Sequence, residues 1–323
     1  AGGATFTLTA TGTNFVAGSK VRWSGQDLAT AFVSATQLTA TVPANLIATG
    51  GTVPVTVFTS TPGGGVTSAQ TFTITGGAPA VATVSAASFL GVELAPESIV
   101  AAFSSASLAT GIAVATTVPL PTTLLGTKVV VRDSASTSRD AALFFVAPGQ
   151  VNYQIPPGTD AGNATVTVTV NSNVVAVGTI KVAAVAPGLF SANASGQGVA
   201  AAVVLRIRNG VQTFEPVSQF SQAAGGQVPV DVDLGPAGDI VYVLFYGTGL
   251  RGRTAPGNIS VTIGNSTRAL NSANFEDAFA VAGFVGLDQA NVLLPRTLIG
   301  AGLVNVSLTI DGKVSNTIQL KIK

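Results

Sequence analysis

Apolar residues and threonines alternate along most of the chain. The alternation is clearest at residues 6–11, 53–57, 164–170, 304–310 and 318–322. A period of two places successive side chains on opposite faces, which is typical of half-buried β-strands. The segments between these runs carry Gly, Pro, Asn and Ser, the residues that favour turns. The pattern therefore predicts an all-β chain of immunoglobulin-like β-sandwiches.

A repeated spacing indicates how many sandwiches there are. In each copy a Phe is followed after five residues by a Gln, and the Gln after six residues by a Pro. The copies are Phe32, Gln37 and Pro43; Phe145, Gln150 and Pro156; and Phe284, Gln289 and Pro295. Three copies of one supersecondary unit predict three tandem immunoglobulin-like β-sandwich domains.

The spacing also suggests a structural role for each repeated residue. We predict that the Phe ends a strand and points inward, and that the Gln begins the next strand and bonds backbone groups at the turn. The Pro would end that strand, because it has no N–H for the ladder. The alternative, that these Gln residues contact a ligand, stays open at this stage.

Domain boundaries follow from the repeat and from two Gly- and Pro-containing linkers, at residues 76–79 and 186–188. We predict domains at residues 1–76, 77–187 and 188–323. The third carries an insertion near residues 214–239, which contains two Gly-rich turns.

The amino-acid composition excludes most classes of enzyme. The 323 residues include no His, Cys or Met, and only 9% are charged. Without His or Cys there is no Ser-His-Asp triad, no thiolate nucleophile and no Cys- or His-ligated metal. We therefore expect no enzyme and no cofactor.

Charge and hydropathy limit the possible partners. The net charge is +1, which gives no electrostatic basis for binding nucleic acid. Arg206 with Arg208, and Arg251 with Arg253, are spaced as solvated charges on one face of a strand. No apolar run reaches the roughly 18 residues of a membrane-spanning helix. We expect neither a nucleic-acid partner nor a membrane span.

One acidic cluster is a candidate metal or hydrolase site. Asp231 and Asp233 share a strand face, and Asp239 follows nearby. Calcium needs six to eight oxygen ligands, and these carboxylates could supply some of them. The competing interpretation is a solvated loop of the insertion. A polysaccharide platform would need exposed aromatic residues, whereas Trp23 follows Val21 in phase and is expected in the core.

Two segments resemble known families. Residues 1–75 resemble the IPT/TIG domain, an immunoglobulin-like sandwich, through Gly12-Thr13-Asn14-Phe15, Val21-Arg22-Trp23-Ser24-Gly25 and Thr39-Ala40-Thr41-Val42-Pro43. Residues from about 85 to 323 resemble the Solibacter-type C-terminal domain of secreted acidobacterial proteins. That resemblance is carried by Pro148-Gly149-Gln150-Val151-Asn152, Ala186-Pro187-Gly188-Leu189-Phe190, Tyr246-Gly247-Thr248-Gly249-Leu250 and Gly286-Leu287-Asp288-Gln289-Ala290-Asn291-Val292. The resemblances imply an extracellular or cell-surface protein and imply no catalytic residues.

The first domain departs from the IPT/TIG pattern at its start. Such domains begin with a strand ahead of the segment at residues 6–11, and the sequence begins after it. We therefore expect Phe6, Leu8 and Ala10 to lie beside an open groove that serves as an assembly edge. The strand that fills it would come either from upstream residues or from another copy of the chain. Burying such a strand would contribute several kcal/mol at roughly 25 cal/mol per Å².

These observations lead to two functional hypotheses. The first is a non-catalytic extracellular structural protein, a subunit of a surface fibre whose partners are other copies of itself. Its copies would assemble head to tail by β-strand addition. The alternative is an adhesin or a polysaccharide-binding stalk module of a larger secreted protein.

Overall fold

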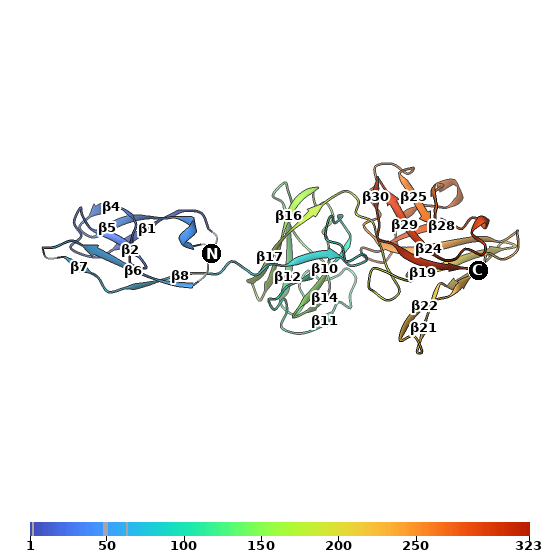
Figure 1. The fold of residues 1–323 in the computed structure, drawn as a ribbon, viewed down its shortest axis with the longest axis horizontal. Coiled ribbons are helices and arrows are strands. Elements are labelled where there is room, and N and C mark those ends of the chain that lie inside the picture. The colour runs from blue at the N-terminus through green and yellow to red at the C-terminus, as the bar shows by residue number, and fades with distance from the viewer. Residues whose placement is uncertain (2, 48–50, 63) are drawn as a thin grey trace. The chain divides into compact units, whose positions relative to one another are not determined.

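The computed structural model is all-β, as the alternation predicted (Figure 1). It describes residues 1–323 except residues 2, 48–50 and 63. Helical structure in the described part is limited to three short 3-10 helices: η1 (Ala44–Ile47), η2 (Ser272–Asn274) and η3 (Arg296–Leu298). None of these helices has the length or apolar character needed to cross a membrane.

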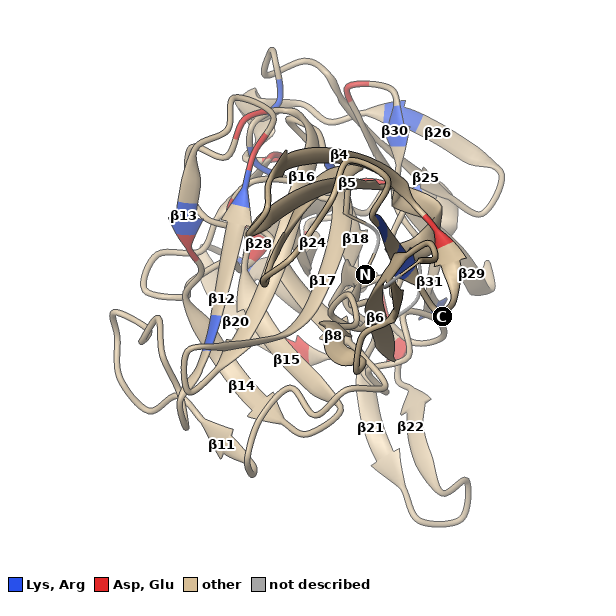
Figure 2. Cartoon of the chain, turned by 90° about the vertical axis from the view of Figure 1, so that its left-hand side faces the viewer, with Lys and Arg blue, Asp and Glu red and all other residues tan. Residues whose placement is uncertain are grey.

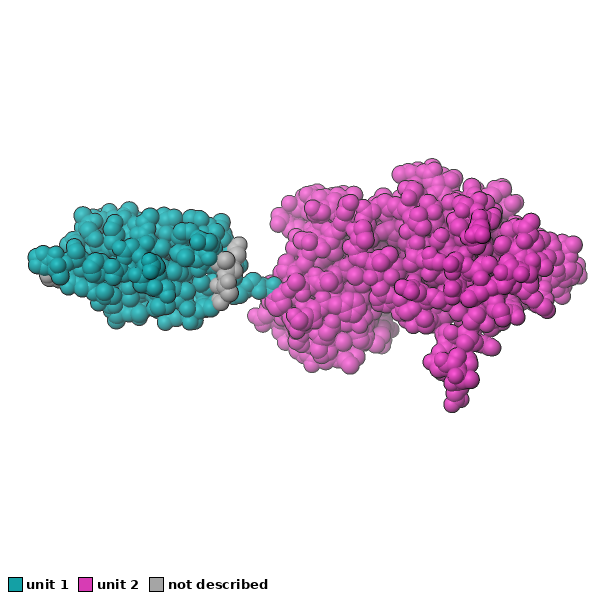
Figure 3. All heavy atoms as spheres, viewed as in Figure 1, with its two compact units in different colours: residues 1–78 teal, residues 79–323 magenta. Residues whose placement is uncertain are grey.

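The chain forms two compact units, residues 1–78 and residues 79–323 (Figure 3). The first unit has one hydrophobic core and the second unit has two. Each core lies between two sheets, so the chain contains three β-sandwiches. We refer to the sandwiches as first (residues 1–78), second (residues 79–184) and third (residues 185–323). The predicted boundary between residues 187 and 188 falls inside the second unit.

The first sandwich pairs a three-stranded sheet, β1-β5-β4, with a sheet ordered β3-β2-β6-β7 in which β8 also pairs with β6. Val21, Leu38 and Val42 are fully buried between the two sheets. The strands are β1 (Phe6–Thr11), β2 (Lys20–Trp23), β3 (Gln26–Asp27), β4 (Ala29–Ser34), β5 (Gln37–Val42), β6 (Gly51–Thr59), β7 (Gly65–Val66) and β8 (Gln70–Ile74).

The second sandwich packs sheet β11-β14-β15-β10-β9 against sheet β13-β12-β16-β17. Its core includes the completely buried Tyr153, whose hydroxyl lies 3.3 Å from Oγ1 of Thr83. The strands are β9 (Ala82–Ser85), β10 (Ile99–Phe103), β11 (Ala113–Val114), β12 (Thr127–Arg132), β13 (Ser138–Asp140), β14 (Leu143–Ala147), β15 (Gln150–Gln154), β16 (Gly162–Val170) and β17 (Asn173–Val182).

The third sandwich packs sheet β20-β19-β24-β28-β27 against sheet β23-β31-β29-β25-β26, with β18 and β30 as short additions. A separate hairpin, β21-β22, projects from it (Figures 1 and 2). The strands are β18 (Gly188–Leu189), β19 (Ala202–Arg208), β20 (Val211–Pro216), β21 (Ser218–Ser221), β22 (Gly226–Pro229), β23 (Asp231–Val232), β24 (Ile240–Thr248), β25 (Ile259–Ile263), β26 (Ser266–Ala269), β27 (Ala278–Ala280), β28 (Asp288–Leu293), β29 (Gly302–Ile310), β30 (Lys313–Val314) and β31 (Ile318–Ile322).

The repeated Gln and Pro fall at equivalent places in the three sandwiches. Gln37 begins β5, Gln150 begins β15, and Gln289 is the second residue of β28. Each strand ends one or two residues before its Pro: Pro43, Pro156 and Pro295. A nine-residue strand follows in each case (β6, β16, β29) and pairs antiparallel with the last strand of its sandwich (β8, β17, β31).

The predicted inward position of the repeated Phe is wrong. Phe32 is 42% exposed, Phe284 is 64% exposed, and Phe145 is only half-buried. The ladder of the edge strand β4 shifts register just after Phe32, and Phe284 lies in the turn between β27 and β28. Neither position keeps the inward alternation of a central strand.

The predicted role of the repeated Gln amide is also wrong at Gln150 and Gln289. The Gln150 amide donates to the side-chain oxygen of Asn152, and the Gln289 amide donates to that of Asn291, both at 2.7 Å. The recipient is a side chain two residues further along the same strand face, not backbone at the turn.

Candidate assembly groove

An open groove of about 450 Å³ lies between β1 and β8 in the first sandwich. Leu8, Ala10 and Phe72 supply apolar side chains to its wall, together with Val55 and Val57 of β6. Its remaining lining residues are Thr9, Thr11, Gly12, Thr13, Phe15, Thr56, Thr67, Ser68, Gln70 and Thr71. None of the lining residues is charged, so the groove offers apolar contacts and neutral hydrogen-bonding groups.

The predicted assembly edge lies on this groove. Leu8 and Ala10 line it directly, whereas Phe6 is not among the lining residues. The Phe6 ring instead stacks on Phe72, with ring centroids 5.8 Å apart. Phe72 also contacts Trp23, with centroids 5.0 Å apart. A layer of aromatic rings therefore supports one side of the groove.

The repeat allows this edge to be compared residue by residue with the other two sandwiches. The repeated Gln pairs with Thr11 in the first, Phe103 in the second and Tyr246 in the third. Counting back from these partners, Leu8 is equivalent to Val100 and Val243. In the same way, Ala10 is equivalent to Ala102 and Phe245.

At these equivalent positions, the side chains of the first sandwich are more exposed than those of the second and third sandwiches. Val100, Val243, Ala102 and Phe245 are all 0% exposed. Leu8 and Ala10, by contrast, are only half-buried. The difference arises from what lies beside each strand, since the repeat places the same framework around all six positions.

In the second and third sandwiches a further strand covers this edge. Strand β9 pairs antiparallel with β10, and β19 pairs antiparallel with β24. In the first sandwich β1 is the outermost strand of its sheet and pairs only with β5 among the described residues. An unpaired edge with half-buried apolar side chains is a surface suited to strand addition.

The covering segments also contact the last strand of their sandwiches. Ala80 forms a parallel bridge with Val177 of β17, and Val199 forms one with Gln319 of β31. Within the described part of the first sandwich, β8 pairs with β6 and has no such bridge. The groove thus occupies the place that residues 80–85 and 199–204 fill in the other sandwiches.

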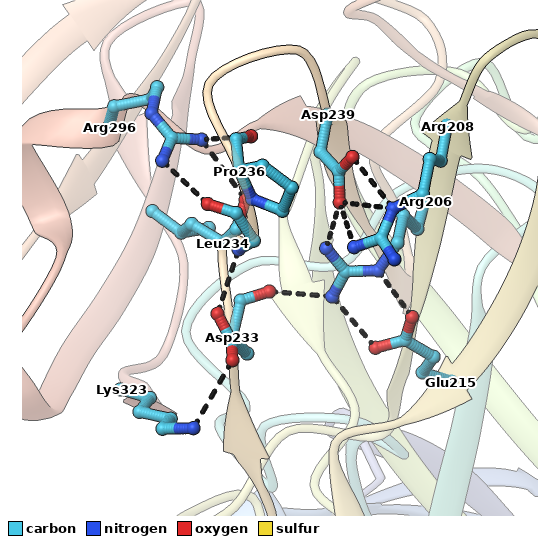
Figure 4. Close-up of polar contacts among 10 residues, drawn as sticks. Arg206, Arg208, Glu215, Asp233, Leu234, Pro236, Asp239, Arg296 and Lys323 are labelled. Carbon is cyan, nitrogen blue, oxygen red and sulfur yellow. Dashed lines mark hydrogen bonds and ion pairs between the residues drawn. The ribbon is translucent and has the colours of Figure 1, made fainter.

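The predicted metal site is not assembled, because each carboxylate is paired with basic side chains. Figure 4 shows the pairs that Asp233 and Asp239 form. Asp231 pairs with Lys321 at 2.8 Å, and Asp233 pairs with Lys323 at 3.3 Å. Asp239 accepts from two arginines. The described residues contain no group of three or more acidic side chains placed to hold an ion.

A network around Arg206 fixes the insertion of the third sandwich (Figure 4). Its guanidinium bonds Glu215 at 2.6 Å, Asp239 at 2.9 Å and the backbone carbonyl of Asp233 at 2.6 Å. Arg208 bonds the same Asp239 carboxylate at 2.7 Å. The hydrogen bond from Arg208, opposed by burial and reinforced by Arg206, lowers the pKa of Asp239 to about 2.

The prediction that Arg206 is a solvated charge is wrong, because only 7% of this residue is exposed. The sequence suggested this arginine as part of a surface pair, and its acidic partners come from β20 and from the loop before β24. Arg296 has a similar structural role. It donates to the carbonyls of Leu234, Gly235 and Pro236 at 3.1, 2.7 and 3.0 Å.

The tryptophan and several phenylalanines differ in exposure. Trp23 is 4% exposed, as predicted for a core residue. Seven of the 16 phenylalanines, however, are exposed rather than inward: Phe32, Phe89, Phe214, Phe220, Phe275, Phe279 and Phe284.

Family comparison identifies the sandwich that carries the groove. The family model of the IPT/TIG domain matches residues 1–74. Residues 1–74 are an IPT/TIG domain. This confirms the resemblance predicted for residues 1–75, whereas the Solibacter-type resemblance remains an expectation. No curated protein matches the chain.

Solved structures with some likeness to the chain include two bacterial adhesins and a surface-layer protein. One is a Ca²⁺-stabilized adhesin by which an Antarctic bacterium binds ice, with 13% identity over 100% of this chain and 95% of that one, and a TM-score of 0.22. Another is a 1.5-MDa bacterial ice-binding adhesin, with 13% identity, coverage of 100% and 92%, and a TM-score of 0.23. The third is surface layer protein SbsC, domains 4–9, with 12% identity, coverage of 96% and 40%, and a TM-score of 0.20. At these TM-scores the three structures are too dissimilar to indicate a fold or a function for this chain.

Proposed function

We propose that the chain is a non-catalytic structural subunit of an extracellular fibre whose copies join head to tail by β-strand addition at the IPT/TIG groove. The observation that carries this proposal is the difference between equivalent edges. The β1 edge is open and half-buried, whereas the β10 and β24 edges are paired and buried. A strand from a second copy would complete the same arrangement.

The geometry of such a contact leads to a filament. The groove of one copy would receive a different surface of the next copy, so the interface is heterologous. A heterologous contact that does not close into a ring propagates as an open filament. Main-chain hydrogen bonds would supply affinity, and the pockets for alternate side chains would set register.

Surface composition supports packing between copies. Only 9% of residues are charged, so repulsion between neighbouring copies is weak. Strands β4 and β5 of the IPT/TIG sheet carry no charged residue, as Figure 2 shows. The seven exposed phenylalanines add apolar surface. A structural subunit also fits a chain without His or Cys whose Asp231, Asp233 and Asp239 carboxylates are paired with Lys or Arg.

The first test is sedimentation of native material in mild buffer, with negative-stain images of the same sample. Uniform fibres in the pellet support the proposal. A compact monomer of 32.0 kDa that stays in solution contradicts it. That result would favour the adhesin or polysaccharide-binding stalk, which an insoluble-polysaccharide pull-down would then examine.

A matched pair of variants links fibres to the groove. The Ala10 side chain lines the groove, whereas Thr41 on the neighbouring strand β5 is exposed and lies outside the groove lining. Ala10→Lys places a charge where the added strand would bury it, and we expect the fibres to be lost. Thr41→Lys adds the same charge on the outer face of the same sheet, and we expect fibres to persist. Equal behaviour of the two variants would rule out a role for the groove.

A further inference from the structure

We propose that the IPT/TIG groove accepts an uncharged extended segment that runs antiparallel to β1. This segment carries small or β-branched side chains at the two positions opposite Ala10 and Leu8. It carries a third such side chain two residues before the position opposite Ala10. The inference rests on the proposed function and adds the polarity, the register and the side-chain class of the donor. The two covered sandwiches of the same chain provide its templates.

The backbone of β1 determines which groups are free to pair. The Gly12 amide donates to the carbonyl of Thr36, on the side of β5. In an antiparallel ladder successive residues direct their N–H and C=O groups to opposite sides. Thr7, Thr9 and Thr11 therefore direct their backbone groups toward the open edge, where an added strand would bond them.

The second sandwich shows the register of a bound segment. Thr83 pairs with Ala102, the equivalent of Ala10, and Ser85 pairs with Val100, the equivalent of Leu8. Thr83 and Ser85 face inward with 7% and 5% exposure. Two residues before Thr83, Val81 is also buried, and its amide donates to Val177 of the last strand at 3.2 Å.

The third sandwich repeats this arrangement with different residues. Ala202 pairs with Phe245, and Val204 pairs with Val243, which are the equivalents of Ala10 and Leu8. Two residues before Ala202, Ala200 is fully buried, and its amide donates to Gln319 of the last strand at 3.0 Å. Both templates therefore contact the last strand of their sandwich first (β17 or β31). They then pair with the opposite sheet, at β10 or β24, and run in the same direction.

The side-chain class follows from the templates and from the groove wall. The inward residues of the templates are Val, Thr and Ser in one and Ala, Ala and Val in the other. Residues 80–85 and 199–204 contain no charge and no Pro. The IPT/TIG groove has an uncharged wall as well, so a charged donor side chain would be desolvated without a partner. Phe72 contributes a large apolar ring to the wall of the groove.

The probe is a synthetic fluorescent peptide with the sequence of residues 79–86, added to depolymerised full-length chain. We expect saturable binding with one site per chain, measured by fluorescence polarisation. The same peptide with Thr83→Lys should bind at least tenfold more weakly. In the full chain, Thr9→Pro removes an N–H that points to the open edge and should weaken binding at least tenfold, whereas Thr9→Val keeps that N–H and should not.

Register is tested by disulfide trapping, which the Cys-free sequence makes specific. Val84 pairs with Ala101, which is equivalent to Thr9. A Val84→Cys peptide should form a disulfide with the Thr9→Cys chain under mild oxidation. An Ala82→Cys peptide, displaced by two residues, should react far less. Equal reaction of both peptides would overturn the register.

The outcomes separate the two proposals. Peptide binding in the expected register without fibres in native material supports this inference and contradicts the proposed function. Fibres that form while the peptide does not bind overturn this inference and leave the proposed function standing. Undiminished fibres from Thr9→Pro, together with no peptide binding to the parent chain, contradict both. Unchanged melting of Thr9→Pro and Thr9→Val establishes that the comparison concerns folded chains.

Discussion

Oδ1 of Asp288 lies 2.6 Å from Nε of Arg251, and the Asp288 side chain is completely buried. The other carboxylate oxygen accepts a hydrogen bond from the Leu250 amide at 2.8 Å. Nη1 of the same arginine lies 3.6 Å from Oε1 of Glu97 in the second sandwich. A buried ion pair of the third sandwich therefore reaches the surface where the two sandwiches of the second unit meet.

Removing the arginine of this pair should strongly destabilise the second unit. Arg251→Met leaves the Asp288 carboxylate buried without its cation, and breaking a buried pair in this way costs about 3–5 kcal/mol. Glu97→Gln is the control, since the Glu97 side chain is 41% exposed and a solvent-screened pair contributes about 0–1 kcal/mol. Denaturant unfolding followed by circular dichroism measures both. Equal losses for the two variants would contradict a central role for Asp288.

The Arg206 network predicts a pH dependence of stability. The pKa of Asp239 is lowered to about 2, chiefly by its hydrogen bond from Arg208. A carboxyl group whose folded-state pKa is depressed stabilises the fold above its unfolded pKa of about 3.9, and that contribution is lost as pH falls toward 2. Asp239→Asn should therefore lower the melting temperature at pH 6, and the difference from the parent chain should shrink between pH 4 and pH 2. A difference independent of pH would show that ionisation of Asp239 is not involved.

The projecting hairpin should contribute little to folding. Strands β21 and β22 pair only with each other, and an isolated two-stranded hairpin is marginally stable. The Val230 amide donates to the carbonyl of Val217 at its base, 2.9 Å away, and Val217 is buried. Replacing residues 219–228 with a short turn preserves this base and should change the free energy of unfolding by no more than about 0.5 kcal/mol. Calorimetry of the shortened chain measures this, and a loss several times larger would place the hairpin in the packed structure.

Because Leu8 is half-buried and Val243 is fully buried, truncating the two side chains should reduce stability by different amounts. Leu8→Ala removes more carbon atoms than Val243→Ala, yet we expect it to cost about 1 kcal/mol less in depolymerised chain, because Leu8 is already partly exposed. Saturation with the residue 79–86 peptide should increase the cost of Leu8→Ala and leave that of Val243→Ala unchanged. The thermal transitions of the two variants, with and without peptide, provide the comparison.

Period-two alternation located the strands, and the Gln and Pro spacing located equivalent strands in three sandwiches. The groove could be anticipated because Phe6, Leu8 and Ala10 form an alternating apolar strand that the IPT/TIG resemblance places second in its sandwich. The prediction for Phe32 and Phe284 failed because alternation identifies a strand without identifying its position in the sheet. A register shift or a turn is enough to move such a ring into solvent.

The ion pairs could not be predicted from the sequence, for a different reason. Arg206 and Asp239 are 33 residues apart, and Arg296 donates to carbonyls about 60 residues before it. These distances in sequence are closed by the topology of the third sandwich, which no local pattern specifies. The acidic cluster therefore suggested a cation site, whereas the fold supplies arginine and lysine to the same carboxylates.

The groove occurs on one sandwich of the three, and this has a kinetic consequence for any assembly built through it. The two ends of a growing polymer would be chemically different, since one end always presents an empty groove and the other never does. A short peptide would occupy that one terminal groove and also the groove of every free subunit, so it would stop elongation only at concentrations comparable with that of the free subunits. The inhibitory dose would then rise with the concentration of free subunits and would not depend on the number of fibre ends.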